Sequence, residues 1–301
     1  MRIVVTGRTG QVVRSLVARA APTPEYEIIP VGRPELDLLG TGDLSHIFAA
    51  RHPDLIISAA AYTAVERAED EPDVAFAVNA AGAERVAQAA AAIGVPVIHL
   101  STDYVFSGVS DRPYSENDAP APCGVYGRSK LAGELAVAAA NPNHVILRTA
   151  WVYSPFGSNF VKTMLRKALE SDTVSVVADQ FGNPTSAFDI ADGILAVASR
   201  LADVSPSSCY GTFHLAGTGS TNWATFATYV FEVSREAGGP FATVHAISTD
   251  EFPTKARRPA NSILNTDKFH KAFGWRAPQW RKSTRKIVLN ILKENRLKYN
   301  Y

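Results

Sequence analysis

A tyrosine and a lysine stand four residues apart in the chain, at Tyr126 and Lys130. On a helix, side chains with this spacing lie on one face, so the phenol and the ammonium would be neighbours. A nearby ammonium favours the phenolate and lowers the pKa of a tyrosine from its usual value of about 10. A phenol in that setting can give a proton to a carbonyl oxygen near neutral pH. The pair therefore predicts general acid chemistry, although this spacing alone is common by chance.

A hydroxyl side chain follows the fourth strand that we expect, in Ser101-Thr102-Asp103. Open α/β sheets bind their ligands at the carboxyl ends of the strands, so this hydroxyl is expected to face the same ligand as the tyrosine. The order along the chain is a glycine-bearing turn, then this hydroxyl, then the Tyr–Lys pair. That order is more specific than any one of the three motifs.

Two glycines mark the turn after the first expected strand, in Gly7-Arg8-Thr9-Gly10. Gly7 permits a tight turn, and Gly10 lets backbone N–H groups approach a pyrophosphate at the N-terminus of the following helix. Because the turn opens a β-α-β pattern, it indicates a dinucleotide site, which includes Gln11 and Val12. Val13 departs from the pattern, since glycine is usual there for close packing of the helix on the strand.

The second expected strand ends in Gly32-Arg33, where an acidic residue would bind the ribose hydroxyls of NADH. An arginine can instead pair with a 2′-phosphate, which favours NADPH and leaves NADH and a solvated loop arginine as the alternatives. Asp37 and Leu38 are expected to border the adenine. Ala59, Ala60 and Ala61, with Tyr62 after them, follow the third strand, where a cofactor would pass closely or where small residues simply fill space.

The first half of the chain alternates short β-branched runs with helical patterns. Strands are expected at 2–6, 26–31, 55–58, 97–101 and 145–149, and helices at 10–20, 44–51, 72–93 and 129–139. Because parallel strands need crossover connections, this alternation predicts a doubly wound parallel sheet of Rossmann type with helices on both faces. Residues 1–150 would form the NAD(P)-binding domain.

Beyond Trp151 the pattern is less regular, with Pro and Gly between the elements. Helices are expected at 159–170, 189–202, 223–237 and 285–298, and short strands at 174–177, 212–215 and 243–246. Residues 151–301 would form mainly a smaller α/β lobe that binds the substrate. Part of 170–187 is expected to return to the first domain.

The formal net charge of +1 gives no broad positive field to attract nucleic acid or a membrane surface. A small anionic substrate needs only a few local cations. Cys123 and Cys209 are far apart in sequence, so we expect no disulfide framework and a reducing compartment. The apolar run after Met1 is too short for a secretory signal, and no apolar stretch is long enough to cross a bilayer. These observations predict a cytoplasmic enzyme that acts on a small molecule.

Several blocks of the sequence resemble the extended short-chain dehydrogenases/reductases. They are Ala61-Tyr62-Thr63-Ala64-Val65-Glu66, Ser101-Thr102-Asp103-Tyr104-Val105-Phe106, Pro113-Tyr114-x-Glu116, Tyr126-Gly127-x-Ser129-Lys130-x-x-Gly133-Glu134, Arg148-Thr149-Ala150-Trp151-Val152-Tyr153, Asp179-Gln180-Phe181-Gly182-x-Pro184-Thr185 and Ala256-Arg257-Arg258-Pro259-x-Asn261-Ser262. The resemblance runs from residue 3 to about residue 280, which is nearly the whole chain. It implies the reduction, by NADPH, of the C4 ketone of dTDP-4-dehydro-6-deoxy-L-mannose to dTDP-L-rhamnose.

The resemblance also implies roles for the matching residues. Tyr126 would donate the proton, Lys130 would hold the nicotinamide ribose and tune Tyr126, and Thr102 would bind the reacting oxygen. Ser101 would border the cofactor. The substrate contacts would be Asp103, Tyr104 and Trp151 at the sugar, and Arg257 and Arg258 at the diphosphate, unless those two arginines are simply solvated.

Some dimeric members of this family bind Mg²⁺ through glutamates at the subunit interface. Ser15 and Phe188 stand at the matching places here, and neither can act as a carboxylate ligand, so we expect no metal. The chain would be a monomer or a homodimer. Two alternatives stay open. One is a related reductase or epimerase for another nucleotide sugar, and the other is a non-catalytic NADP-binding regulatory subunit, against which the intact Thr102, Tyr126 and Lys130 argue.

Overall fold

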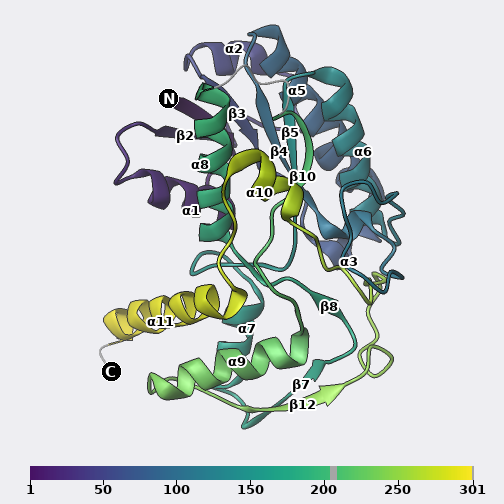
Figure 1. The fold of residues 1–301 in the computed structure, drawn as a ribbon, viewed down its shortest axis with the longest axis vertical. Coiled ribbons are helices and arrows are strands. Elements are labelled where there is room, and N and C mark those ends of the chain that lie inside the picture. The colour runs from purple at the N-terminus through teal and green to yellow at the C-terminus, as the bar shows by residue number, and fades with distance from the viewer. Residues whose placement is uncertain (204–208, 300–301) are drawn as a thin grey trace.

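The computed structural model describes residues 1–203 and 209–299, and a parallel sheet of six strands stands at its centre (Figure 1). The strand order is β10-β5-β4-β3-β1-β2. The bounds are β1 (Arg2–Thr6), β2 (Glu27–Val31), β3 (Leu55–Ser58), β4 (Val97–Thr102), β5 (His144–Thr149) and β10 (Gly211–His214). The doubly wound Rossmann-type sheet is thus confirmed, and its five expected strands fall within one residue of their expected bounds.

Helices cover both faces of this sheet, as Figure 1 shows. The helices α1 (Gln11–Ala20) and α8 (Ala187–Asp203) pack together on one face, and α2 (Leu44–Ala49), α5 (Ala83–Ala92) and α6 (Val125–Ala140) cover the other. Side chains alternate between the two faces along each strand: Ile3 and Val5 pack against α1 and α8, whereas Val4 faces α5. Burial on both faces explains why the strands are continuous apolar runs.

The helix expected at 72–93 is interrupted. It consists of α4 (Pro72–Phe76), a π-helical turn η1 (Ala77–Gly82) and α5, and the short helix α3 (Val65–Ala68) precedes it. π-helical turns are rare and are frequent at functional sites. The turn brings Asn79, which is buried, beneath the expected catalytic residues.

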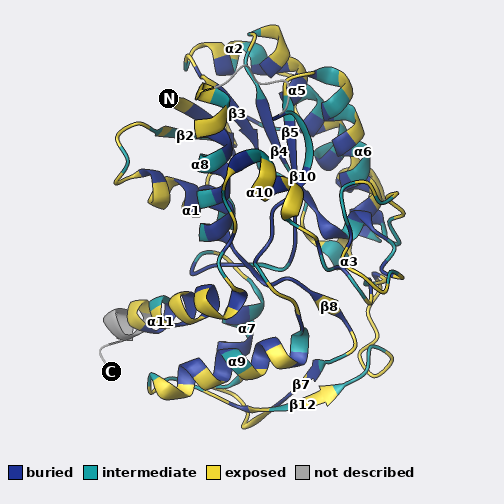
Figure 2. Ribbon diagram, in the orientation of Figure 1, coloured by how far each residue is buried: buried dark blue, intermediate teal, exposed yellow. Residues whose placement is uncertain are grey.

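The second lobe is built around its own apolar core. The helices α7 (Phe160–Lys167), α9 (Trp223–Glu236) and α11 (Trp280–Tyr299) pack with the parallel pair β7 (Thr173–Val177) and β12 (Thr243–Ile247). In Figure 2 the inner faces of α9 and α11 are buried and their outer faces exposed, as expected for helices that cover a core. The remaining elements are η2 (Asp103–Val105), β6 (Val152–Tyr153), β8 (Phe181–Gly182), β9 (Thr185–Ser186), β11 (Thr221–Asn222) and α10 (Asp267–Phe273).

The segment that returns to the central sheet differs from the expected one. We expected part of 170–187, but β7 pairs with β12 in the lobe. The sixth strand of the sheet is β10, which pairs with β5, and α8 precedes it against α1. The reason is packing, because α8 supplies Ile190, Ile194 and Val197 to the core beneath the sheet. Within the described ranges, no helix is long and apolar enough to cross a membrane.

Candidate active site

The glycine turn lies between β1 and α1, in the conformation that an anion site needs. Gly7 has a φ of +98°, which a side chain would strain. Gly10 precedes α1 with extended backbone, and no side chain of the described residues caps the first-turn N–H groups of that helix. A Cβ at Gly10 would meet nothing within 4 Å. The open space and the free N–H groups fit the pyrophosphate of a dinucleotide. Of the two helix residues in the expected site, the Gln11 side chain accepts instead from Ser154 and Asn159, and so ties α1 to the second lobe.

The loop after β2 approaches the glycine turn closely, since a Cβ at Gly32 would lie 3.4 Å from the Cα of Gly7. Arg33 is exposed there, and its guanidinium makes no hydrogen bond or ion pair within the described part of the chain. A second cation, which the sequence reasoning missed, comes from the turn itself: Arg8 pairs with Glu35 at 2.9 Å. Asp37 caps the N–H group of Leu39 at 3.0 Å, and Leu38 is buried against η1.

The backbone after β3 is held at both ends. The hydroxyl of Thr6 accepts from the N–H groups of Ala59 and Ala60, both at 3.0 Å. The amide side chain of Asn79 accepts from the N–H group of Tyr62 at 2.8 Å and donates to its carbonyl at 3.0 Å. Ala61 lies between these anchors and is partly exposed. The small residues expected along the cofactor therefore lie in a fixed strip of backbone. Asn79 was missed, because nothing in an alanine-rich helix pattern marks one amide as a buried anchor.

The helix α6 carries Tyr126 in its first turn and is positioned by neighbours distant in sequence. Its first N–H group, at Val125, donates to the Glu69 carboxylate at 2.8 Å. A Cβ at Gly127 would lie 2.2 Å from the carbonyl oxygen of Tyr104, and one at Gly133 would lie 2.1 Å from that of Asn79. Both glycines therefore allow α6 to pack tightly on η2 and η1. This explains the glycines of the Tyr126-Gly127 and Gly133-Glu134 motifs.

Tyr126, Thr102 and Asp103 meet at the carboxyl end of β4. Burial raises the pKa of Tyr126 to about 12, the Thr102 hydroxyl opposes that shift through a hydrogen bond, and the Asp103 charge adds to it. Asp103 is 2% exposed and accepts from the Thr102 hydroxyl at 3.0 Å. Burial raises the pKa of Asp103 to about 6, against hydrogen bonds from Ser262 and Thr102. At neutral pH the phenol is therefore protonated, which is the form that can give a proton.

We expected Lys130 to lower the pKa of Tyr126, and this expectation is wrong for this arrangement of the chain. The Lys130 ammonium donates to the carbonyl of Leu100 at 2.6 Å and lies 3.4 Å from Nε2 of His99. Burial, partly offset by the charge of Glu134, lowers the pKa of Lys130 to about 8. The helical spacing predicted that the Tyr126 and Lys130 side chains share one face of the helix. It did not predict which acceptors the Lys130 ammonium would bind.

Ser101, expected beside the cofactor, has a different side-chain partner. Its hydroxyl donates to Glu134, which forms a buried ion pair with Arg148 at 2.6 Å. The Glu134 and Arg148 side chains are 4% and 5% exposed, so the pair is shielded from solvent. It joins α6 to β4 and β5 beneath the site. Only the backbone of Ser101 is left to border a ligand.

The substrate lobe supplies an aromatic wall and a cavity of about 310 Å³. Trp151 stacks on Trp223 with the ring centroids 3.5 Å apart. The cavity is lined by Phe160, Thr163, Met164, Lys167, Ser175, Val176, Val177, Gln180, Trp223, Phe252, Thr254 and Arg258. Of the two expected arginines only Arg258 lines it, while Arg257 is exposed outside it. Phe160 and Trp223 were missed, because aromatic residues on amphipathic helices are read as core.

Arg258 is held by α3. Its guanidinium donates to Glu66 at 2.9 Å, and its Nε is buried without a partner among the described residues. The Arg258 charge also lowers the pKa of Tyr104, which burial raises above its usual range. Tyr104 packs edge-on against Tyr126, with the centroids 5.6 Å apart. Tyr104 and Arg258 thus lie between the reacting end of the site and the lobe.

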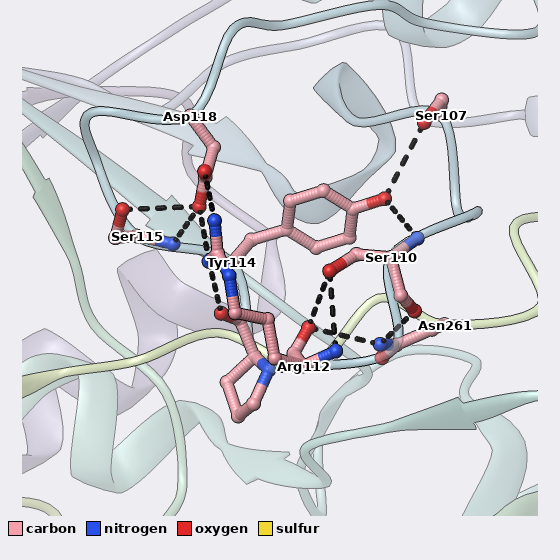
Figure 3. Close-up of polar contacts among 8 residues, drawn as sticks. Ser107, Ser110, Arg112, Tyr114, Ser115, Asp118 and Asn261 are labelled. Carbon is pink, nitrogen blue, oxygen red and sulfur yellow. Dashed lines mark hydrogen bonds and ion pairs between the residues drawn. The ribbon is translucent and has the colours of Figure 1, made fainter.

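The segment 255–264, which we call the strap, crosses from α3 to the loop after β4. Its Asn261 side chain donates to the carbonyls of Ser110 and Arg112, at 2.8 and 3.1 Å. Figure 3 shows this contact beside the Tyr114 hydroxyl, which accepts from the N–H group of Ser110 at 3.1 Å. The N–H group of Gly108 donates to the same hydroxyl at 3.0 Å. The motifs around Tyr114 and Asn261 therefore bind two loops together. The strap holds Arg258 against Glu66 and Ser262 against Asp103.

Neither of the two positions compared with metal ligands in the sequence, Ser15 and Phe188, carries a carboxylate. Ser15 is buried, and Phe188 packs against Phe156 with the centroids 5.8 Å apart. The described residues contain no group of three or more His, Cys, Asp or Glu side chains that could hold a metal ion.

This strand order, with a glycine turn after β1, a threonine at the end of β4 and a tyrosine and a lysine on α6, defines a short-chain dehydrogenase/reductase of the Rossmann type. The UDP-glucose 4-epimerase of Thermus thermophilus, solved with NAD, has the same fold. Its TM-score is 0.79 at 20% identity, over 97% of this chain and 99% of that one.

The chain belongs to the family described as RmlD substrate binding domain, whose model matches residues 1–293. It is 52% identical to the dTDP-4-dehydrorhamnose reductase of Sinorhizobium fredii, over 98% of this chain and 99% of the relative. It is 42% identical to the dTDP-4-dehydrorhamnose reductase of Salmonella typhimurium, over 97% of this chain and 98% of the relative. The dTDP-4-dehydrorhamnose reductase of Bacillus anthracis, solved in complex with NADP, has a TM-score of 0.88 at 36% identity and covers 96% of this chain and 99% of its own. The family resemblance read from the motifs is confirmed.

Proposed function

We propose that the protein reduces the C4 ketone of dTDP-4-dehydro-6-deoxy-L-mannose with NADPH and so forms dTDP-L-rhamnose. The observation that carries this proposal is the Tyr126 phenol against the Thr102 hydroxyl at the carboxyl end of β4, in a chain of this family. The relatives that match over nearly their full length are named for this reaction.

The residues of the chain would divide the work as follows. Thr102 and Tyr126 would both donate hydrogen bonds to the ketone oxygen. When bound, NADPH supplies the hydride that reduces the carbonyl carbon. Tyr126 would give its proton to the oxygen as negative charge develops there. Lys130, charged below a pH of about 8, would bind the ribose hydroxyls beside Tyr126. Because each donor is fixed by packing, the site spends little free energy on reorganisation.

We assign the lobe cavity to the nucleotide end of the substrate. Phe160 and Trp223 offer flat apolar faces to a base, and Arg258, which also lines the cavity, offers its guanidinium to a diphosphate. Trp151 would wall the sugar between that end and Asp103 and Tyr104. Residues 1–150 with the returning α8 and β10 would form the cofactor domain, and most of the other described residues would form the substrate lobe.

The glycine turn and Arg33 would hold the pyrophosphate and the 2′-phosphate of NADPH. We further propose that catalysis and assembly need no metal, because Ser15 and Phe188 cannot be carboxylate ligands. Activity and sedimentation should therefore be unchanged by EDTA, and a loss restored by Mg²⁺ would show the opposite. We place the reaction in the cytoplasm, since neither Cys123 nor Cys209 forms a disulfide and the cofactor is a cellular one.

The test is NADPH consumption with the dTDP-linked 4-keto sugar, compared with UDP- and GDP-linked sugars. Turnover with the dTDP sugar, and loss of kcat by about a hundred- to ten-thousand-fold in Tyr126→Phe, would support the proposal. Thr102→Val, which keeps the shape, should cost about ten- to a hundred-fold. Faster turnover of another nucleotide sugar would reassign the substrate. Tight NADPH binding without turnover of any sugar would indicate a regulatory subunit.

A further inference from the structure

A buried histidine lies directly behind the catalytic lysine. His99, on β4, is 1% exposed. Its Nδ1 lies 3.1 Å from the hydroxyl of Ser58 at the end of β3, and its Nε2 lies 3.4 Å from Nζ of Lys130. Three polar side chains thus form a line from β3 through β4 to α6. None of the roles assigned above uses His99 or Ser58.

The hydrogen-bond inventory fixes the tautomer of this imidazole. A lysine ammonium has three donors and no acceptor, so His99 Nε2 must be the acceptor. The imidazole proton then lies on Nδ1 and is donated to Ser58. Burial lowers the pKa of His99 well below its usual value, and the positive charge of Lys130 lowers it further. The ring is therefore neutral. Two N–H groups of Lys130 are therefore committed, one to His99 and one to the carbonyl of Leu100.

We propose that His99 is a positioning residue for the reaction, which holds the Lys130 ammonium so that its third N–H group points at the cofactor ribose. The inference rests on the proposed function and deepens it. Ser58 orients the ring by accepting from Nδ1. The Leu100 carbonyl and the His99 ring each accept one N–H group of the Lys130 ammonium. With two N–H groups fixed in this way, only one direction is left for the third N–H group.

This arrangement has a consequence for pH dependence. The titratable groups that face Lys130 among the described residues are His99 from β4 and Glu134 from its own helix, and Glu134 is paired with Arg148 of β5. The His99 lone pair favours the ammonium over the amine. Without that acceptor Lys130 should lose its proton at a lower pH, and the alkaline limb of cofactor binding and of kcat/KM should move with it.

Two substitutions separate the two ring nitrogens. His99→Gln can keep an acceptor near the position of Nε2, whereas His99→Asn can keep only the contact of Nδ1 with Ser58. We expect His99→Asn to move the alkaline limb down by about one pH unit and to lower kcat/KM at pH 8 roughly ten-fold, as for a hydrogen bond to a charged group. His99→Gln should restore most of both. The matched control is His214→Asn, because His214 is also fully buried and has its pKa lowered to about 3, but lies at the end of β10 away from Lys130.

Two readouts keep this inference distinct from the proposed function. The first is the dissociation constant of NADPH against pH, from tryptophan fluorescence, which needs no sugar. The second is the pH profile of kcat/KM with the 4-keto sugar. If wild-type protein binds NADPH but reduces no sugar, the proposed function fails and the binding profile still tests His99.

If His99→Asn leaves the alkaline limb of NADPH binding in place, His99 is only structural. The same holds if His99→Gln, His99→Asn and the His214→Asn control behave alike. If His99→Asn does not fold, Ser58→Ala tests the same role of His99. The inference requires Ser58→Ala to shift the alkaline limb of NADPH binding to lower pH, by less than His99→Asn would.

Discussion

Trp151 and Trp223 stack face to face, with their ring centroids 3.5 Å apart and their planes 6° from parallel. Trp151 follows β5 and has a φ of +47°, a left-handed conformation that is costly for a bulky residue. Trp223 begins α9, and both indoles pack against the core of the substrate lobe. A strained residue that persists at a ligand site is held there by its surroundings. The stack therefore joins the segment after β5 to α9 at the wall that we assign to the sugar.

Gly182→Ala should disturb this wall without touching the cofactor domain. A Cβ at Gly182 would lie 2.5 Å from the Trp151 indole, so the ring must move. We expect the KM for the sugar nucleotide to rise about ten-fold, as for about 1.4 kcal/mol of lost binding, while the affinity for NADPH is kept. Steady-state kinetics measure the first and fluorescence titration the second. Gly42→Ala is the control, because a Cβ there meets nothing within 4 Å. An unchanged KM in Gly182→Ala would mean that Trp151 does not contact the substrate.

Arg33→Ala should weaken the preference for NADPH over NADH. Arg33 is exposed and unpaired among the described residues, and is thus available to a 2′-phosphate, whereas Arg8 is already paired with Glu35. We expect the ratio of kcat/KM for the two cofactors to fall about ten- to a hundred-fold, as for one lost charge-assisted contact. A wild type that prefers NADH, or an unchanged ratio in Arg33→Ala, would show that this arginine does not read the phosphate. Glu35→Gln then tests Arg8, which it should release.

The elements of the first domain could be predicted because each strand is a short β-branched run buried on both faces. Val97–Thr102 and His144–Thr149 are examples. The start of α6 could not be located. Gly124 has no side chain, and the cap is Glu69, which lies 56 residues before Val125. A cap supplied from so far away leaves no trace in the local pattern.

The site residues were predictable where a motif fixes them and not where a fold contact does. Tyr126, Lys130 and Thr102 come from motifs with known spacing. His99, the partner of Lys130, comes from a buried strand, and Asn79, which anchors Tyr62 and Ser129, comes from a π-helical turn. In both places the sequence reads as apolar or alanine-rich. A strand was expected at 212–215, but its return to the central sheet as β10 was missed, because a local pattern does not show which strand it pairs with.

Asp103→Asn should stabilise the protein at neutral pH and not in acid. Burial raises the pKa of Asp103 from 3.8 to about 6, so the folded chain binds this proton more tightly than the unfolded chain does. The carboxylate therefore costs stability above pH 6, and the cost disappears as the pH falls through 6 toward 4. A shift of about two pKa units corresponds to about 3 kcal/mol as an upper value. Urea unfolding at pH 7.5 should show Asp103→Asn to be more stable by about 1–3 kcal/mol, and the gain should shrink at pH 4.5. An equal difference at both pH values would mean that folding does not shift the pKa of Asp103.

Tyr114→Phe should loosen the strap that Figure 3 shows tied to the loop after β4. The Tyr114 hydroxyl accepts from the N–H groups of Gly108 and Ser110, and phenylalanine would leave both without that acceptor. Buried donors left unpaired cost about 1–3 kcal/mol, so the free energy of unfolding should fall by that amount. Stacking of the ring on Phe106 should survive, since only the oxygen is removed.

The kinetic consequence distinguishes a coupled strap from a merely less stable loop. Because the strap carries Arg258, we expect Tyr114→Phe to raise the KM for the sugar nucleotide several-fold while kcat and the affinity for NADPH change little. Tyr26→Phe is the matched control, as its hydroxyl makes a single long contact of 3.5 Å with the Leu195 carbonyl on the far side of the sheet. Amide exchange at Gly108 and Ser110 should speed up in Tyr114→Phe and not in the control. Lower stability with an unchanged KM would show that the loop and the strap are not coupled to substrate binding, and that Arg258 is positioned by Glu66 alone.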